Sequence, residues 1–328
     1  MNRLPEADTE VASLARTGSW PELPLDGWRD SYATLHLYTQ IVGKTRLALA
    51  PTENHWWQVA LYTTSRGLTT SPMPYDRRTV QVDFDFIDHQ LLVRTSDGGS
   101  ASLALVPRSV ADFYAEYTKL LDSLGVRVKI WPVPVELPEV IPFAEDREHS
   151  SYDADAVNRF WRVLVHSDCV MRAFRGRFVG KASPVHFFWG SFDLAATRFS
   201  GRTAPPHPGG APHVADWVMR EAYSHEVSSA GFWPGGGVID EPAYYSYAYP
   251  EPPGYADALV GPEGAYYDPT IREFILPYEV VRNAPSPEET LMTFLESSYE
   301  AAANLGQWDR AALEMAPVES HGRGKEGG

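Results

Sequence analysis

The chain has 328 residues, which is enough for two ordinary domains or one large one. Hydrophobic residues make up 44% and charged residues 22%, a composition typical of folded globular proteins rather than disordered chains. The formal net charge is −15, and such a surface repels phosphate backbones. We therefore expect no nucleic acid among the partners.

Membrane insertion and disulfide chemistry are not expected either. No apolar run approaches the roughly 20 residues that a helix needs to cross a bilayer, and the first residues lack the apolar stretch of a signal peptide. Cys169 is the single cysteine, which excludes an intrachain disulfide and a thiolate-rich zinc site. We expect a cytoplasmic protein without a membrane partner, and the oligomeric state stays open.

The first half, residues 19–140, is predicted to follow a flexible N-terminus at 1–18. Apolar residues at helical spacing predict one helix over 28–43, which stops at Gly43, and a capped helix over 109–125. Alternating apolar residues predict strands between these helices. The strands are expected at 45–50, 57–64, 79–87, 90–95 and 100–106.

The second half, residues 153–308, follows a Pro-rich and acidic linker at 141–152, which is expected to lie as a strap across the surface. Helical spacing predicts helices over 153–176 and 286–306. Insertions rich in Pro, Gly and Tyr occupy about 200–215 and 234–270, and their many tyrosines indicate that they pack against the body. Residues 316–328 are predicted to be a disordered tail.

Two strings in the chain resemble one another. The first half contains QIVGKTRLALAPTENHWWQVALYTTSRGLTT, and the second contains RFVGKASPVHFFWGSFDLAATRFSGRTA. Both read Val-Gly-Lys and later His followed by two aromatic residues. A chance match of short strings is the alternative, but the order of the predicted elements agrees as well. We therefore favour an α+β fold of internally duplicated helix–antiparallel sheet–helix units that pack as one body.

Three histidines are the candidate catalytic residues. His55, His186 and His225 are considered as acid–base groups or ligand contacts, because an imidazole titrates near neutral pH. His55 belongs to the string NHWW, which we expect to open a strand, so that Trp56 and Trp57 point to opposite faces. The alternative is that these histidines are hydrogen-bonded core residues.

Basic residues and tryptophans are the candidate ligand-binding residues. Arg172 and Arg175 share a face of a predicted helix and, with Lys181, would hold a carboxylate or phosphate; pairing with nearby acidic residues is the alternative. Lys44 does not belong to a phosphate loop, because Tyr38 occupies the position of the first glycine. The polar row on its helix contains His36, Gln40 and Lys44. The complete set of candidates is Lys44, Trp57, Arg172, Arg175, Lys181, Trp189 and Trp233.

The residue types of a facial iron triad also occur. His166 and Asp168 have the His-x-carboxylate spacing, and His225 is a possible third ligand. The first two lie in a predicted helix, where residues two apart point in widely different directions, so a polar helix face is the competing interpretation. Whether a metal or another cofactor is bound stays unknown.

Longer strings carry a family resemblance. WPELPLDGWRDSYATLHLYTQIVGKTRLAL, NHWWQVALYTTSRGLTT, HSDCVMRAFRGRFVGKASPVHFFWGSFDLAATRFSGR and SHEVSSAGFWPGG together resemble a bacterial family of uncharacterised proteins, a domain of unknown function. The resemblance covers about residues 19–305. It transfers no catalytic residue and no cofactor, and it implies that the two halves belong to one unit.

Three functions are compatible with these patterns. The first is a small-molecule enzyme with a His/Arg/aromatic-lined pocket for an anionic or aromatic substrate. The second is a non-catalytic protein that binds a ligand or a partner, with the aromatic residues as a platform. The third is a metal-dependent oxygenase of the non-haem iron type.

Overall fold

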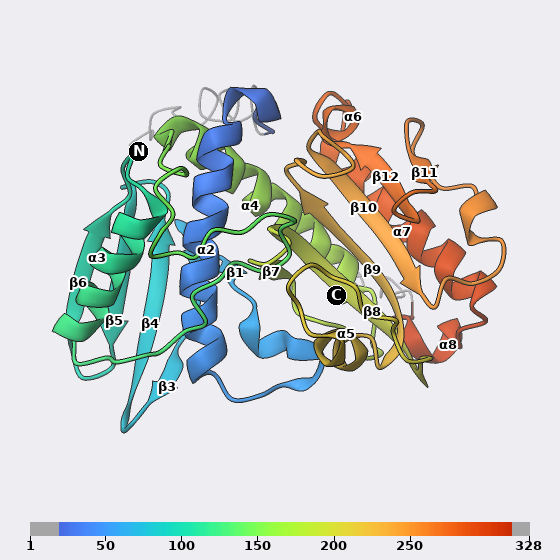
Figure 1. Ribbon diagram of the computed structural model, residues 1–328. Coiled ribbons are helices and arrows are strands. Elements are labelled where there is room, and N and C mark those ends of the chain that lie inside the picture. Colours follow the sequence, from blue (N-terminus) through green and yellow to red (C-terminus); the bar gives the residue numbers. More distant parts are fainter. Residues whose placement is uncertain (1–19, 317–328) are drawn as a thin grey trace, which may run out of the picture.

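Two antiparallel sheets, each flanked by two long helices, make up the chain in the computed structural model, which describes residues 20–316 (Figure 1). Each half runs helix, sheet, helix, as the sequence predicts. The fold is therefore mixed α+β. The predicted flexible N-terminus at 1–18 and, apart from residue 316, the predicted tail lie outside the described residues.

The first half begins with a short 3₁₀ turn and the helix α2. Its elements are η1 (Leu25–Gly27), α2 (Arg29–Leu49), η2 (Asn54–Val59), β1 (Tyr62–Thr63), β2 (Gly67–Thr69), β3 (Met73–Tyr75), β4 (Arg78–Asp85), β5 (Gln90–Thr95), β6 (Ser100–Ala104) and α3 (Val110–Ser123). The sheet order is β1-β2-β4-β5-β6, and β3 pairs with β4. On β4, Val80, Val82 and Phe84 are buried, which confirms the face predicted from the alternation.

The second half begins with α4 and carries the larger strands. Its elements are α4 (Ala154–Gly176), β7 (His186–Phe188), β8 (Asp193–Thr203), α5 (Asp216–Ala222), β9 (His225–Trp233), β10 (Ala243–Tyr249), η3 (Tyr255–Asp257), β11 (Tyr266–Asp268), β12 (Glu273–Pro277), α6 (Tyr278–Arg282), α7 (Pro287–Leu305) and α8 (Arg310–Leu313). The sheet order is β11-β12-β10-β9-β8-β7. Helices α4 and α7 cover one face of this sheet (Figure 1). These two helices leave the opposite face of the sheet uncovered.

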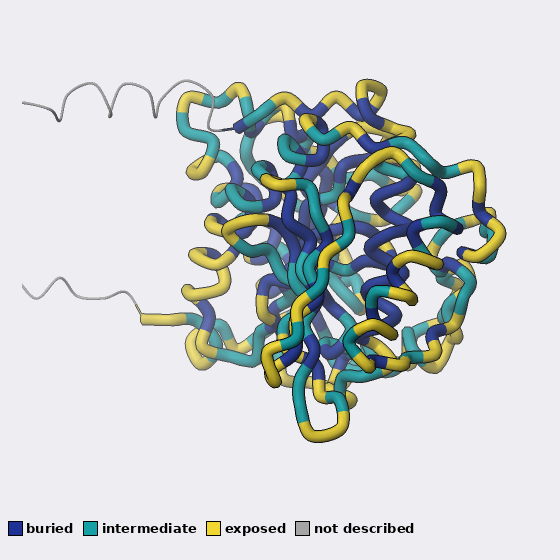
Figure 2. The backbone as a smooth tube through the Cα atoms, turned by 90° about the vertical axis from the view of Figure 1, so that its left-hand side faces the viewer, coloured by how far each residue is buried: buried dark blue, intermediate teal, exposed yellow. Residues whose placement is uncertain are grey.

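The two sheets meet edge to edge. Leu61, next to β1, forms an antiparallel bridge with Phe187 of β7, and two backbone hydrogen bonds of 2.8 Å join them. One hydrophobic core contains buried side chains from both halves. Figure 2 shows the buried segments running through the interior, with exposed loops around the outside. The two halves therefore pack as one body.

The prediction that a helix stops at Gly43 and a strand follows at 45–50 is wrong, because α2 continues to Leu49. Gly43 lies inside the helix, where it allows a close approach. A Cβ atom there would lie 2.3 Å from Cδ1 of Trp189, so the missing side chain is what lets the indole rest on α2. Packing against a distant residue, rather than helix termination, explains this glycine.

The prediction that NHWW opens a strand is also wrong. These residues form η2, and His55 and Trp56 adopt left-handed backbone conformations with φ of 57° and 61°. The strand begins later, at Tyr62. Trp56 and Trp57 therefore do not alternate across a sheet.

The similar strings do not occupy equivalent positions. Val42, Gly43 and Lys44 lie within α2, whereas Gly180 and Lys181 follow the end of α4. Gly180 there bonds through its backbone to Leu313. The internal duplication thus stays a prediction that depends on the order of the elements and not on the strings.

Candidate functional site

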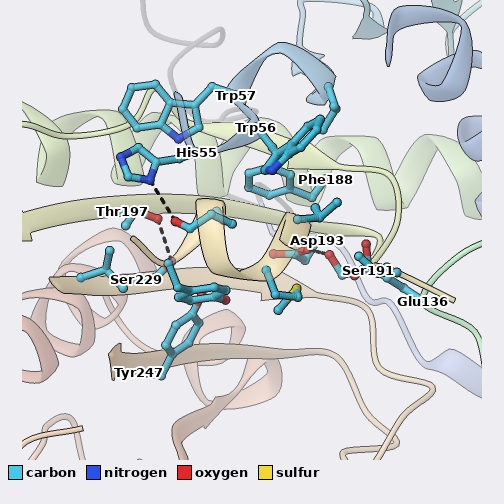
Figure 3. A pocket seen from close by; sticks show the side chains of 18 of the residues that line it. His55, Trp56, Trp57, Glu136, Phe188, Ser191, Asp193, Thr197, Ser229 and Tyr247 are labelled. Atoms are coloured by element: carbon cyan, nitrogen blue, oxygen red, sulfur yellow. Dashed lines mark hydrogen bonds between the residues drawn. The ribbon is translucent and has the colours of Figure 1, made fainter. Parts of the chain in front are cut away.

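A cavity of about 370 Å³ lies on the face of the second sheet that α4 and α7 leave free (Figure 3). Side chains from β8, β9, β10 and β12 form its floor. Helix α5, the segment before it and the η2 turn cover it. We call this cavity the sheet pocket. Its size is in the range of small-molecule sites.

Strand periodicity explains why the floor is open. Ala195, Thr197 and Phe199 alternate along β8 toward the pocket, and Val227 and Ser229 do so along β9. Most of these side chains are small, so they leave space above the sheet. Thr197 Oγ1 and Ser229 Oγ lie 2.9 Å apart and offer hydroxyl groups to the cavity.

Aromatic side chains form most of the walls. Tyr223 and Tyr247 are joined by a hydrogen bond of 2.8 Å between their hydroxyl groups, and the rings of Trp233 and Tyr245 lie 5.0 Å apart. The aromatic lining residues are Trp56, Trp57, Phe188, Phe199, Tyr223, Trp233, Tyr245 and Tyr247. Such walls suit a ligand with an apolar or aromatic body.

Three carboxyl groups line the pocket without a compensating arginine or lysine: Glu136, Asp193 and Glu273. Asp193 is 6% exposed and accepts hydrogen bonds from Ser191 Oγ and Tyr245 Oη. Glu273 Oε2 is buried and has no hydrogen-bond partner among the described residues. We call this group the carboxyl cluster.

The surroundings favour the protonated forms of these acids. Burial, together with the neighbouring Asp193, raises the pKa of Glu273 to about 8. The same two causes raise the pKa of Glu136 to about 7, although this residue stays partly open to solvent. Burial also raises the pKa of Asp193, against the effect of its two hydrogen bonds. Carboxyl groups that titrate near neutral pH can both give and take a proton.

Glu136 comes from the segment between α3 and α4, residues 124–153, which we call the strap; it is longer than the predicted linker at 141–152. Gln40 of α2 holds this strap: its Nε2 donates to Val135 O and its Oε1 accepts from Val135 N, both at 2.9 Å. The backbone of Glu136 has φ of 59°, and its N–H donates to Pro212 O at 2.8 Å. Gly190 leaves room for the carboxyl group, because a Cβ atom there would lie 2.0 Å from Glu136 Oε1.

The polar row predicted on the first helix thus faces the strap and not water. His36 Nε2 lies 2.8 Å from Gly190 O, beside Gln40. Lys44 is buried, with its ammonium group 5.6 Å from the centre of the Trp189 ring. Burial lowers the pKa of Lys44 to about 8, and the charge of Glu136 opposes this effect. This row therefore positions Glu136 from outside the pocket.

His55 lies at the edge of the sheet pocket with both ring nitrogens engaged. Nδ1 is 2.9 Å from Ala222 O, and Nε2 is 2.5 Å from the ammonium group of Lys181. Nδ1 must therefore carry the proton, and Nε2 accepts from Lys181. Burial, and less strongly the charge of Lys181, lowers the pKa of His55, so the ring is neutral at pH 7. His225 lies beside it, with the ring centres 5.5 Å apart.

His186 does not line the pocket. It is completely buried, its ring stacks on Phe188, and neither ring nitrogen has a hydrogen-bond partner among the described residues. Burial lowers its pKa to about 3, so the ring is neutral. The three candidate histidines are thus not brought together at one cavity.

The basic candidates also lie outside the sheet pocket. Arg172 pairs with Asp168 one helical turn away, and Arg175 donates to Ser183 O. Lys181 covers the outer side of His55. Of the tryptophans, Trp57 and Trp233 line the cavity, whereas Trp189 is buried against α2 and donates to Val59 O.

The weak metal candidates do not form a ligand group. His166 stacks on Trp20, Asp168 is held by Arg172, and His225 is the neighbour of His55. Within residues 20–316 there is no group of three or more His, Cys, Asp or Glu residues that could hold a metal ion.

The carboxyl cluster was missed from sequence, because its members are more than fifty residues apart and no spacing connects them. Glu136 lies in the strap, Asp193 begins β8 and Glu273 begins β12. The available signal was indirect: most side chains along 195–197 and 227–231 are small, which indicates a strand face that large side chains do not fill.

Comparison with known proteins places the chain in a family. The model of a family of unknown function, DUF5996, matches residues 20–315. The chain belongs to this family. Its match spans both sheets, the strap and the sheet pocket, so the predicted resemblance is confirmed at the level of the family.

Neither a curated protein nor a solved structure matches the chain. None of the described helices is both long and apolar enough to cross a bilayer.

Proposed function

We propose that the protein is a small-molecule enzyme, and that its substrate binds in the sheet pocket and exchanges a proton with Glu136 or Glu273. The observation that carries the proposal is the position of these two carboxyl groups, which lie together in a cavity with aromatic walls and have no ion-pair partner among the described residues. Acid–base catalysis needs a group that titrates near the working pH, close to the substrate.

The proposal keeps the prediction of an aromatic substrate but assigns it to other residues than the predicted histidines and arginines. Arginine does not line the pocket within the described part of the chain, so an anionic substrate has little to bind to there. His55 is assigned a supporting role, because Lys181 occupies its free lone pair. The acid–base role passes to the carboxyl cluster.

Turnover of a small-molecule extract tests this proposal. The purified protein is incubated with the fraction of a bacterial extract below about 1 kDa, and mass spectrometry compares the masses before and after. We expect at least one mass to be consumed by the wild type and spared by Glu136→Gln, by Glu273→Gln or by both. Glu263→Gln, at an exposed position outside the pocket, is the matched control.

A second candidate function is a non-catalytic binding protein, and the engaged ring nitrogens of His55 favour it. The same experiment separates the two. If the wild type and the two folded pocket variants leave identical extracts, the enzyme proposal is refuted and binding without turnover is the better account. A cytoplasmic location belongs to this proposal as an expectation.

A further inference from the structure

We propose that the ligand of the sheet pocket is an organic cation, whose ammonium or amidinium group lies among Glu136, Asp193 and Glu273 while its apolar body contacts the aromatic walls. This inference rests on the proposed function only in using the same pocket. It assigns a chemical class to the ligand whether or not turnover follows.

The first argument is a missing cationic partner, without which these carboxyl groups hold their protons near neutral pH. Two other buried or partly buried carboxyl groups pair with arginine: Asp85 with Arg66, and Glu251 with Arg272. By contrast, the described residues provide no ion pair within 4.0 Å for any member of the carboxyl cluster. A bound cation would supply the missing partner.

The groups around the carboxyl cluster do not supply the missing positive charge. Lys44 faces Glu136 from α2, but its ammonium group lies over Trp189 and forms no ion pair. Asp268 acts on Glu273 from β11 and adds negative charge. Tyr245 of β10 donates a hydrogen bond to Asp193 and is itself neutral. His55, which also lines the pocket, is neutral and has both ring nitrogens engaged.

The second argument is an unused acceptor. Glu273 Oε2 is buried at the pocket and accepts no hydrogen bond from any described residue. An unpaired buried oxygen is unfavourable, and a donor on a ligand would satisfy it. An ammonium or amidinium group carries several donors and no acceptor, which matches three carboxyl groups.

The third argument is the nature of the walls. Trp233, Tyr245 and Tyr247 stand next to the cluster along β9 and β10. The face of an aromatic ring attracts a cation, most strongly where water is excluded. An anion would meet repulsion at both the acids and the ring faces. The charge of the cluster, its free hydrogen-bond acceptor and the aromatic walls therefore all favour an organic cation.

Isothermal titration calorimetry with three matched probes tests the inference. The probes are 2-phenylethylamine, its neutral analogue 2-phenylethanol, and the anion phenylacetate. At pH 8 we expect the amine to bind at least tenfold more tightly than the alcohol, and phenylacetate to bind least. Amine affinity should rise at least tenfold from pH 6 to pH 8, because binding displaces protons from the acids, whereas alcohol affinity should not rise.

A pair of variants assigns the effect to the cluster. Glu273→Gln should weaken amine binding at least tenfold and change alcohol binding less than twofold, while Glu263→Gln should leave both unchanged. Circular dichroism of each variant checks the fold. Amine binding should release protons, which titrations in buffers of different ionisation enthalpy measure. Fewer protons should be released per bound amine in Glu273→Gln.

The results that overturn the inference differ from those that overturn the proposed function. An alcohol or phenylacetate that binds as tightly as the amine, or a failure of all three probes to bind, refutes the cation. The extract experiment is independent of these probes: loss of turnover in Glu136→Gln and Glu273→Gln would still support an enzyme with another substrate class.

Discussion

Glu273 shows how one side chain acquires its properties from its surroundings. It begins β12, at the floor of the sheet pocket, with Asp193 nearby and no cation paired to it among the described residues. Glu251, of the same type, contacts Arg272 and Tyr267, whose hydrogen bonds lower its pKa despite burial. The difference lies in the partners and not in the residue, so it is invisible in the amino-acid string.

The raised pKa of Glu273 predicts a pH dependence of stability. Its pKa is about 8 in the folded protein against an ordinary value of 4.5, so the folded state holds the proton more tightly. This stabilisation is complete below pH 4.5 and is lost as the pH rises toward about 8, by up to about 1.4 kcal/mol per pH unit. Glu273→Gln should therefore gain stability relative to the wild type from pH 5 to pH 8.

Urea unfolding at pH 5, 6, 7 and 8 measures this effect. Glu263→Gln, which changes an exposed carboxyl group outside the pocket, should follow the wild type at every pH. A constant difference between the wild type and Glu273→Gln across this range would contradict the assignment.

At the scale of elements, α2 and the strap act together. His36, Gln40 and Lys44 form a row on one face of α2. Gln40 bonds to the backbone of Val135, which precedes Glu136, and His36 bonds to Gly190 O, beside the Glu136 carboxyl group. The strap itself has no helix or strand, so these side-chain bonds replace a regular hydrogen-bond ladder. A helix in the first half thereby positions a pocket residue of the second sheet.

Gln40→Ala should release the strap locally. The variant removes the acceptor for Val135 N and the donor to Val135 O, so we expect a loss of about 1–3 kcal/mol in the free energy of unfolding. Residue-resolved hydrogen exchange should show the Val135 amide exchanging at least tenfold faster.

Thr118→Ala, which removes an exposed hydroxyl group on α3, is the control and should leave Val135 unchanged. Unaltered protection of Val135 in Gln40→Ala would mean that the strap is held by other contacts.

In the whole molecule, the two sheets are joined at their edges and the two halves contribute to one hydrophobic core. The Leu61–Phe187 bridge joins the sheets, and Phe187 also packs against Phe160 of α4 and Phe192. A core that crosses the boundary leaves neither half with a complete set of buried partners. We expect both halves to unfold together.

Phe187→Ala tests this cooperativity. Truncation of a completely buried ring should cost about 3–5 kcal/mol. Tryptophan fluorescence and far-ultraviolet circular dichroism should then shift together to lower urea as one transition. A second transition at the wild-type midpoint would show that one half is stable alone, and would contradict a shared core.

Local spacing of side chains predicts the periodic elements correctly. The strands at 79–87 and 90–95 and the helices at 109–125, 153–176 and 286–306 follow from local spacing, since the side chains that define each one lie within a few residues. The α+β order and the family resemblance were readable for the same reason. Predictions about Gly43 and NHWW failed where a distant contact overrode the local pattern.

The candidate site, by contrast, depends on contacts between residues far apart in the chain. The histidines and arginines are candidates because of their chemistry, but the fold engages them elsewhere. Lys181 contacts His55, Asp168 pairs with Arg172, and His186 is buried in the core. Glu136, Asp193 and Glu273 stand more than fifty residues apart in the chain and meet only where the strap reaches the sheet pocket. Their combined effect on one another's pKa arises from that meeting, because it depends on distances in space and not on positions along the chain.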